Sequence, residues 1–401
     1  MTEIEFSIYG DQPSPLEGPF LDEFQAKHSI RVRTSRMTWD EAWPKLLNFA
    51  VYGGGPDISQ IGAIWTSSLV SMNALRPFTS QEIDDLGGKR AFFEPTWQSA
   101  ILPGRPQVWG IPFTAFTYIV LYRRDLLQLA GIAEQTAFES AQAMAETLKR
   151  LRAAGVKSPW VLPSGNPYRG RVHIASSWVW GAGGDWVSDD GQHVLFDQRQ
   201  ARAGLKAFFE LYRHLSPLDY NLTYDACLHR FATGRAAMTI AGATMPATIK
   251  SWNENPQVLD NLGTAVVPGV PWVGGSNIVI WREAQAHHER ERAAILLAKY
   301  LASRTMQVNY AASANLLPTR SDALPSLQFE PISLRPTFER TLRTGRSYKP
   351  AQMWVRMLND LSSTFDLITA DQLADPALDV DQTLAKYLDP LARMFDRMLS
   401  R

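Results

Sequence analysis

Cysteine is almost missing from this chain, which has one cysteine among its 401 residues. A single cysteine excludes an internal disulfide and a zinc site built from cysteines. That residue, Cys227, stands in the stretch DACLHRF, which is typical of a helix, and a buried structural thiol is the commoner state of such a cysteine. The cysteine content therefore favours neither a disulfide scaffold nor thiol catalysis.

Net charge and long apolar runs are missing too. Forty basic residues balance 40 acidic ones, without a long run of either sign. The sequence therefore gives no sign of a basic surface for nucleic acid or an anionic membrane. No segment approaches the roughly 18 uninterrupted apolar residues of a membrane span. The start, MTEIEFSIYG, alternates like a strand and contains no signal peptide, which leaves a cytoplasmic protein and a processed exported protein both open.

Motifs of the common catalytic and cofactor sites are absent as well. No GxxxxGK[ST] loop is present, and the stretch WGAGGDW lacks the GxGxxG spacing of a dinucleotide site. His287 and His288 have no HExxH pattern or carboxylate cluster beside them, and no serine lies in a GxSxG turn. We therefore expect no cofactor, no metal and no nucleophilic catalysis.

The residues that are present indicate an ordinary globular protein of more than one domain. Hydrophobic residues make up 45% of the chain and charged residues 20%, which supports a real core. Strands are predicted at 4–9, 30–34 and 58–61, with helices between them, and this alternation indicates a parallel sheet covered by helices.

Helix starts are predicted where a polar side chain can cap the first turn. Thr38 with Glu41 and Thr79 with Glu82 form capping-box patterns. The same pattern predicts a helix from Thr136, and Asp197 predicts the cap of another.

Thirteen tryptophans are the one clear excess, about twice the average usage. Trp109, Trp160 and Trp281 lie in apolar runs and are predicted to be core residues. The others of interest stand beside Gly, Ser, Asp or Pro: Trp39, Trp65, Trp178, Trp186, Trp272 and Trp354.

Trp65 has the most informative position, just after the strand predicted at 58–61. The carboxyl end of such a strand is where open α/β sheets bind ligands. Sugars pack the apolar face of a pyranose on an aromatic ring and bond their hydroxyls to planar polar groups. Both requirements recur together here, because Asp11 and Gln12 follow Tyr9, and Gln60 is near Trp65.

Five stretches carry a resemblance to a known family. They are GGGPDISQIGAIW with MNALRPF, VWGIPFTAFTYIVLYRRDLLQLAGI, FATGRAAMTIAG, VPWVGGSNIVIW and LDVDQTLAKYLDPLARMFDRML. In this order they resemble the extracellular solute-binding proteins of family 1, the maltose-binding-protein-like substrate receptors of carbohydrate ABC importers. The resemblance runs over nearly the whole chain.

The fold that this resemblance implies is α/β with two lobes, a type II-like periplasmic-binding-protein fold. Three hinge crossings join the lobes, and the ligand cleft lies between them. We expect the crossings near 113–117, 274–278 and 316–318. The predicted N-terminal lobe comprises 1–114 and 277–316, and the C-terminal lobe comprises 115–276 and 317–401.

The resemblance also implies ligand contacts at Asp11, Gln12, Trp65, Tyr168 and Trp354. The full set of candidate ligand-binding residues adds aromatic and polar side chains near the predicted turns and crossings: Tyr9, Trp39, Gln60, Thr114, Trp178, Asp185, Thr244, Trp272, Gly275 and Ser276.

Two departures from the family bear on specificity. After the MTI strand the maltose-binding members have a tryptophan, whereas this chain has Ala243, Thr244 and Met245. Trp65 stands where those members have a charged contact. The pattern favours a neutral di- or oligosaccharide, or a glycoside, over maltose itself, a small acid or a polyamine.

The function implied by the resemblance is that of a receptor and not of an enzyme. It would bind its carbohydrate ligand as a monomer outside the cytoplasm, close on it and deliver it to the membrane permease subunits of an ABC importer, without nucleic acid. Two alternatives stay open. One is a glycan-acting cleft enzyme, for which Asp11, Asp40, Asp185 and Asp219 could supply paired carboxylates. The other is a binder of the same fold for a peptide or polyamine.

Overall fold

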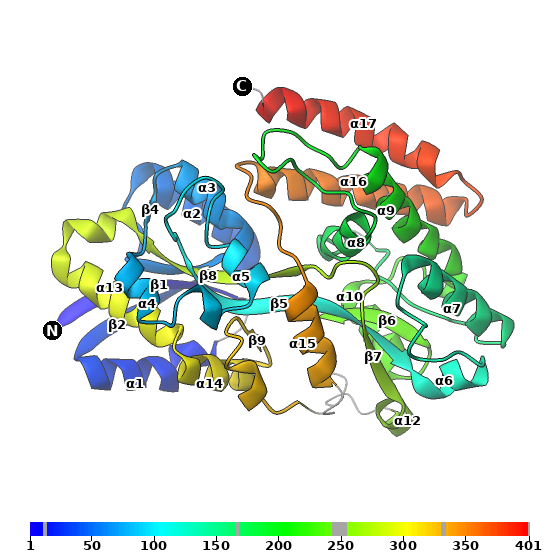
Figure 1. Ribbon diagram of the computed structural model, residues 1–401, viewed down its shortest axis with the longest axis horizontal. Helices are drawn as coiled ribbons and strands as arrows, with labels where there is room; N and C mark the ends of the chain where they lie inside the picture. The colour runs from blue at the N-terminus through cyan, green and yellow to red at the C-terminus, as the bar shows by residue number, and fades with distance from the viewer. Residues whose placement is uncertain (11–13, 166–167, 243–254, 330–333, 400–401) are drawn as a thin grey trace. The chain divides into compact units, whose positions relative to one another are not determined.

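The computed structural model describes residues 1–401 except 11–13, 166–167, 243–254, 330–333 and 400–401 (Figure 1). Contacts divide the chain into two compact units. Unit 1 comprises Met1–Phe116, Val273–Gln328 and Ser347–Trp354, and unit 2 comprises Thr117–Trp272, Phe329–Arg346 and Val355–Arg401.

Unit 1 is a sheet with helices on both faces. Its strands are β1 Thr2–Tyr9, β2 Ile30–Met37, β3 Ile58–Gly62, β4 Leu75–Arg76, the first part of β5 Ile111–Arg123, β8 Val273–Trp281 and β9 Leu317–Pro318. Its α-helices are α1 Pro19–His28, α2 Trp39–Tyr52, α3 Thr66–Ser71, α4 Ser80–Asp84, α5 Glu94–Gln98, α13 His288–Leu301 and α14 Arg304–Ala314. Short 3-10 turns occur at Pro15–Glu17, Ala63–Trp65, Lys89–Ala91, Arg282–Ala286 and Leu324–Ser326.

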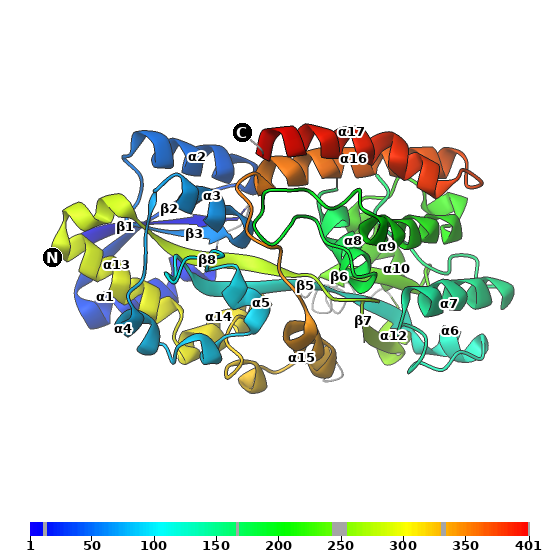
Figure 2. The ribbon, with the colours of Figure 1, turned by 45° about the horizontal axis from the view of Figure 1, so that its top comes forward.

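The sheet of unit 1 has the order β2-β1-β3-β8-β5, with β4 on β8 and β9 on β5. The strands β1, β2 and β3 are parallel, which confirms the prediction from the alternation of strands and helices. Figure 2 shows α2 on one face of these three strands and α1 on the other. As a result, the carboxyl ends of all three strands lie at one edge of the sheet.

Local sequence signals explain where the helices of unit 1 begin. The Thr38 hydroxyl accepts from Glu41 N, and the Glu41 carboxylate accepts from Thr38 N, so α2 starts at a complete capping box. The same reciprocal pair forms between Thr79 and Glu82 at α4. Both capping predictions are confirmed.

The core of unit 1 lies between the sheet and the helices α1 and α13. Alternate residues of β1, Ile4, Phe6 and Ile8, are at most 1% exposed and pack with apolar residues of both helices. The opposite face of β1 carries Ser7, whose hydroxyl lies 2.6 Å from that of Ser59 on β3. Strand alternation thus separates an apolar face from one with buried polar pairs.

The strand β8 enters the sheet beside β3 and comes close to β5. It runs antiparallel to β3, with Gly62 opposite Ser276. Gly275 has a φ of +138°, and a Cβ there would lie 1.9 Å from the Thr114 carbonyl oxygen. Only glycine fits this approach of two backbones.

Unit 2 has a smaller sheet and a larger share of helix. Its strands are the second part of β5, β6 Met238–Gly242 and β7 Leu262–Val266. Its α-helices are α6 Arg124–Leu129, α7 Ala141–Ala153, α8 Gly170–Gly181, α9 Arg199–Glu210, α10 Tyr224–Ala232, α12 Pro256–Asp260, α15 Leu334–Thr344, α16 Trp354–Ala374, whose first residue belongs to unit 1, and α17 Val380–Leu399. Short 3-10 turns occur at Leu211–His214 and Pro217–Asp219.

In unit 2, β5 is the central strand. The segment from Tyr118 to Tyr122 pairs antiparallel with β6, and the segment from Ile119 to Arg123 pairs antiparallel with β7. Beyond the sheet, α9 packs on α8 through Phe208 and Trp178, and on α16 through Phe209 and Phe365. Aromatic contacts therefore join the helices of this layer.

Two predicted helix starts in unit 2 are wrong. Thr136 lies in a turn, and α7 begins later because the Ser140 hydroxyl accepts from Ala143 N. Asp197 is one residue too early, since Gln198 occupies the N-cap of α9. Short polar patterns that resemble helix caps recur by chance in a sequence, and tertiary packing decides at which of them a helix begins.

A buried ion pair connects α8 with α16. The guanidinium of Arg171, which is fully buried, donates to the Asp366 carboxylate at 2.5 Å and to the Pro163 carbonyl at 3.2 Å. Because the pair is buried, removing either residue would leave the charge of the other without a partner in a poorly solvated environment, which is destabilising.

Unit 1 continues past the crossing predicted at 316–318. The reason is that Leu317 and Pro318 pair with Ala115 and Thr114 of β5, inside unit 1. The predicted lobe boundaries and the hinge role of the crossings stay predictions. Across the described ranges, none of the helices has the length and apolar character needed to cross a bilayer.

Candidate functional site

Four aromatic rings gather at the carboxyl edge of the parallel strands of unit 1. Tyr9 ends β1, Trp39 and Trp43 lie in the first turns of α2, and Trp65 ends the 3-10 turn after β3. The ring centroids of Trp39 and Trp65 are 4.7 Å apart with planes inclined by 32°. Tyr9 and Trp39 form a T-shaped pair with ring centroids 5.1 Å apart, and the ring of Trp43 lies 6.0 Å from that of Trp65. We call these residues the ring cluster.

Exposure differs sharply within the ring cluster. Trp39 is 37% exposed, whereas Trp65 is 3% exposed. A Cβ on Gly62 would lie 3.1 Å from the Trp65 ring and 3.3 Å from Cη2 of Trp39. The absence of a side chain at position 62 therefore lets both indoles lie close to the strand end.

Buried hydroxyl and amide groups lie next to the ring cluster. Ser276 Oγ lies 2.6 Å from Thr114 Oγ1 and accepts from Gln60 Nε2 at 3.1 Å. The Tyr9 hydroxyl also forms a hydrogen bond with Ser276. Burial raises the pKa of Tyr9, so its hydroxyl stays protonated. The predicted residues Tyr9, Gln60, Thr114 and Ser276 are thus together, and Gly275 lets the strands carrying them approach.

A second aromatic group lies in unit 2 and contains three tyrosines. The rings of Tyr168 and Tyr224 stack with centroids 5.5 Å apart, and the Tyr168 hydroxyl is 3.5 Å from that of Tyr118. The Tyr224 hydroxyl accepts from Gly242 N at 2.7 Å. Burial raises the pKa of Tyr118 to about 12 and that of Tyr168 well above its usual value, so both hydroxyls stay protonated. A Cβ on Gly170 would lie 2.4 Å from the Tyr168 ring.

Trp272 lies beside this tyrosine group. Its ring stacks on His173 with centroids 4.1 Å apart, and Tyr118 lies 5.9 Å away. Burial lowers the pKa of His173 to about 3, so the imidazole is neutral near pH 7. Neutral imidazole, phenols and indole give this group hydrogen-bonding capacity without charge.

Asp185 and Trp178 have structural contacts in unit 2. The Asp185 carboxylate accepts from Trp180 Nε1 at 3.0 Å and from Trp186 N at 2.9 Å, and it forms an ion pair with Arg346. Trp178 is 2% exposed inside α8. Their predicted ligand contacts stay predictions.

Trp354 is 1% exposed in unit 1. Its ring lies 4.3 Å from that of Tyr348, and its Nε1 donates to the Lys349 carbonyl at 2.5 Å. The predicted contacts Asp11, Gln12 and Thr244 lie outside the described residues.

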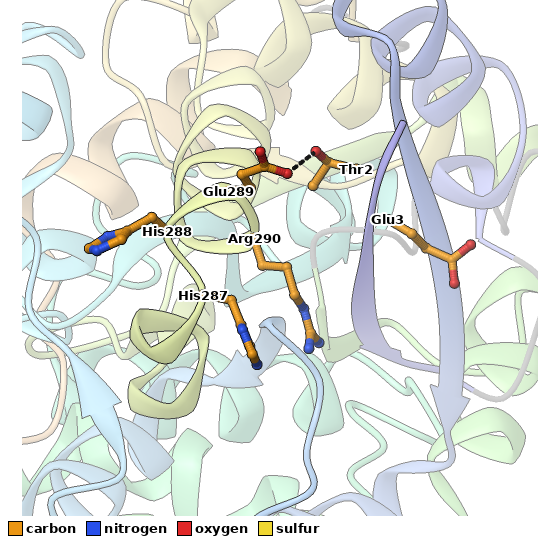
Figure 3. Close-up of a pocket in the computed structure, with 6 residues that line it drawn as sticks. All are labelled: Thr2, Glu3, His287, His288, Glu289 and Arg290. Carbon is orange, nitrogen blue, oxygen red and sulfur yellow. Dashed lines mark hydrogen bonds between the residues drawn. The ribbon is translucent and has the colours of Figure 1, made fainter.

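A hollow of about 510 Å³ lies at the other edge of unit 1, near the start of β1 (Figure 3). Thr2, Glu3 and the segment 287–290 line it. His288 and Glu3 point away from each other in Figure 3, and Arg290 pairs with the buried Asp57. No grouping of His, Cys, Asp and Glu in the described part of the chain suits a metal ion.

Cys227 is buried in unit 2 with Val161 and Ala236. Burial raises the pKa of its thiol, which disfavours the reactive thiolate. The structural role expected from the sequence fits these surroundings.

Some residues of these groups were not among the predicted contacts. Tyr118 stands within the apolar run of β5, and His173, Trp43 and Tyr224 are helical. They share only an aromatic side chain that carries a polar group. Sequence spacing alone could not bring them next to their partners.

Comparisons with known proteins identify the relatives of this chain. A sequence model described as "Bacterial extracellular solute-binding protein" matches residues 20–333. The diacetylchitobiose binding protein DasA of Streptomyces coelicolor is 24% identical over 290 residues, which cover 68% of this chain and 63% of DasA. The chain thus spans less than two thirds of that relative's length.

Solved structures of similar fold cover all or nearly all of the chain. The sugar-binding protein MalE from Xanthomonas citri has a TM-score of 0.83 at 19% identity, covering 100% of this chain and 98% of that protein. The GacH receptor of Streptomyces glaucescens, solved unliganded and with acarbose, has a TM-score of 0.74 at 17% identity, covering 98% and 99%. The predicted two-lobe periplasmic-binding-protein fold is confirmed.

Proposed function

Because the chain belongs to the family of bacterial extracellular solute-binding proteins, we propose that it is the substrate-binding receptor of a carbohydrate ABC importer. The ligand would be a neutral di- or oligosaccharide, or a glycoside. The relatives named for sugars support this proposal: DasA for diacetylchitobiose, MalE as a sugar-binding protein and GacH with acarbose. Membership of this family supports a location outside the cytoplasm.

The observation that carries the proposal is the ring cluster of unit 1 with its adjacent hydroxyl and amide groups. Indoles offer flat apolar surfaces for the C–H face of a sugar ring, and Gln60, Ser276 and Thr114 supply uncharged hydrogen-bonding groups beside them. A small acid or polyamine would need a concentration of opposite charge. This combination therefore supports a neutral, hydroxyl-rich ligand.

Unit 2 supports the same ligand class by independent features. Tyr118, Tyr168 and Tyr224 stay protonated, and the neutral His173 stacks on Trp272. We propose that both units contribute ligand contacts and that the ligand favours the conformation in which it touches both sets. The permease subunits, a monomeric state and a periplasmic or lipid-anchored location belong to the same proposal.

The test is a titration of the purified protein with mono- and oligosaccharides, followed by intrinsic tryptophan fluorescence and isothermal calorimetry. We expect saturable binding of at least one neutral oligosaccharide, and its recovery unchanged by chromatography. Cleavage of the saccharide would support a glycan-acting enzyme instead. Binding of peptides or polyamines without any response to sugars would support a non-sugar solute.

A further inference from the structure

We propose that Trp39 is the ring of unit 1 that contacts the ligand, and that Trp65 is a positioning residue that holds Trp39 in place. The inference rests on the proposed carbohydrate-binding function and divides the roles of two residues that the sequence did not separate. It assigns ligand contact to the first turn of α2 and not to the turn after β3.

Accessibility is the first argument. A ring can stack on a sugar only if one of its faces is open, and Trp65 is 3% exposed. Trp39, Trp43 and Tyr9 surround it at centroid distances of 4.7, 6.0 and 6.1 Å. Trp39 covers Trp65 while itself remaining 37% exposed. Of these two stacked indoles, that of Trp39 is therefore the one available to a ligand.

The fixed orientation of Trp39 is the second argument. Trp39 is the first residue of α2, within the capping box formed by Thr38 and Glu41, and its ring packs against those of Trp65 and Tyr9. An aromatic ring that is ordered before binding loses little conformational entropy when the ligand arrives. Trp65 can thus strengthen binding without touching the ligand, because it fixes the ring that does.

Position in the fold is the third argument. Trp39 lies two residues beyond the end of β2, at the edge where β1 and β3 also end. Open α/β sheets bind ligands at this edge. The substrate class that fits is a saccharide presenting the C–H face of one pyranose ring to the outer face of the indole.

A double-mutant cycle separates the two roles. The variants are Trp39→Ala, Trp65→Ala and the double variant, titrated with the saccharide that binds the wild-type protein. We expect Trp39→Ala to weaken binding about tenfold or more, as is common for aromatic anchors. Trp65→Ala should weaken binding in the wild-type background but add nothing in the Trp39→Ala background, because its effect passes through Trp39. Additive losses would overturn the positioning role.

Conservative variants keep the test valid if Trp65→Ala folds poorly. Trp65→Phe retains a supporting ring and should bind within a few-fold of wild type, as should Trp39→Phe. Trp109→Phe, a partly exposed tryptophan of unit 1 outside the ring cluster, is the matched control and should bind like wild type. Wild-type affinity of Trp39→Ala would overturn the proposal.

Acrylamide quenching gives a readout that a purely structural role would not change. The difference in quenching between wild type and Trp39→Phe reports Trp39 alone, and we expect saturating saccharide to remove most of that difference. Unchanged quenching in the complex would contradict contact at Trp39. A wild-type protein that binds no saccharide would refute the proposed function, and the inference with it, whereas failure at Trp39 alone leaves that function standing.

Discussion

Single residues decide how closely the backbones of unit 1 can approach. Gly275 combines a positive φ with a Thr114 carbonyl in the place where a Cβ would stand. Gly54 also has a positive φ, of +71°, but nothing lies within 4 Å of its Cβ position. A comparison of substitutions at Gly275 and Gly54 therefore separates the energetic cost of a strained backbone from that of steric overlap.

We expect Gly275→Ala to reduce the free energy of unfolding by about 3 kcal/mol or more, because strain and steric overlap act together. Gly54→Ala should cost only about 1 kcal/mol, since only the backbone conformation is unfavourable. Urea unfolding followed by circular dichroism measures both. Equal losses would show that the strands at Gly275 separate easily.

His173 predicts a dependence of stability on pH. Burial lowers the pKa of His173 to about 3 in the folded protein, against about 6.5 in an unfolded chain. Between these values the unfolded state binds a proton that the folded state does not, so stability is lost as pH falls from about 6.5 toward 3.

The variant His173→Phe keeps a ring against Trp272 and removes the titrating group. We expect its melting temperature to fall less than that of the wild type between pH 7 and 4. Carboxylates also titrate in this pH range, but both proteins share them, so their effect on the melting temperature cancels in the comparison. Parallel curves for the two proteins would show that His173 is protonated without cost.

At the scale of elements, local sequence signals and tertiary packing each account for part of the structure. The strands β1, β2 and β3 and the starts of α2 and α4 could be predicted, because alternation and capping act over a few residues. The helix α8 was missed, since the stretches SGNPYRGR and WGAGGDW at its ends contain glycines typical of loops. Gly170 is there because Tyr168 and Tyr118 leave no room for a side chain.

The candidate site shows the same division. Sequence reasoning predicted Trp65 just after the strand that contains Gln60, and the structure has it there. It could not show that Trp39 lies over Trp65, because their contact depends on the packing of α2 against residues after β3. Nor could it bring Tyr224 next to Tyr168, which stands 56 positions earlier by the printed numbering.

A buried charge pair, Arg171 with Asp366, links helix α16 to helix α8. We expect Asp366→Asn to lower the free energy of unfolding by about 3 to 5 kcal/mol, because it leaves the Arg171 guanidinium buried without a counter-charge. The double variant Arg171→Met with Asp366→Leu should lose less than the single variant. A larger loss for the double variant would show that the pair itself contributes net stability.

For the whole molecule, the proposed receptor function predicts that residues of both units affect binding of the same saccharide. We expect Tyr168→Ala in unit 2 to weaken binding about tenfold or more, as Trp39→Ala should in unit 1. Tyr52→Ala is the control, because Tyr52 is 84% exposed and lies at the opposite end of α2 from Trp39. If Tyr168→Ala binds the saccharide with unchanged affinity, Tyr168 does not contribute to binding and the prediction is wrong.

Ligand binding should also stabilise the whole chain. Saccharide at 100 times its dissociation constant adds about 2.7 kcal/mol to the free energy of unfolding, if the unfolded chain does not bind it. The melting temperature of the wild type should therefore rise with ligand concentration, and that of Trp39→Ala should rise less at equal concentration.

The place of β8 between β3 and β5 has a consequence for the order of folding. Ser59 on β3 receives its hydrogen bond from Trp281, which lies 222 residues later in the chain. During synthesis β1, β2 and β3 are made before β8, so one edge of β3 stays unpaired while the more than 200 residues up to β8 are added. Closing so long a loop before the contacts form slows folding, and an open strand edge can pair with other chains meanwhile. The rate at which β8 arrives then sets how long a newly made chain is vulnerable to aggregation.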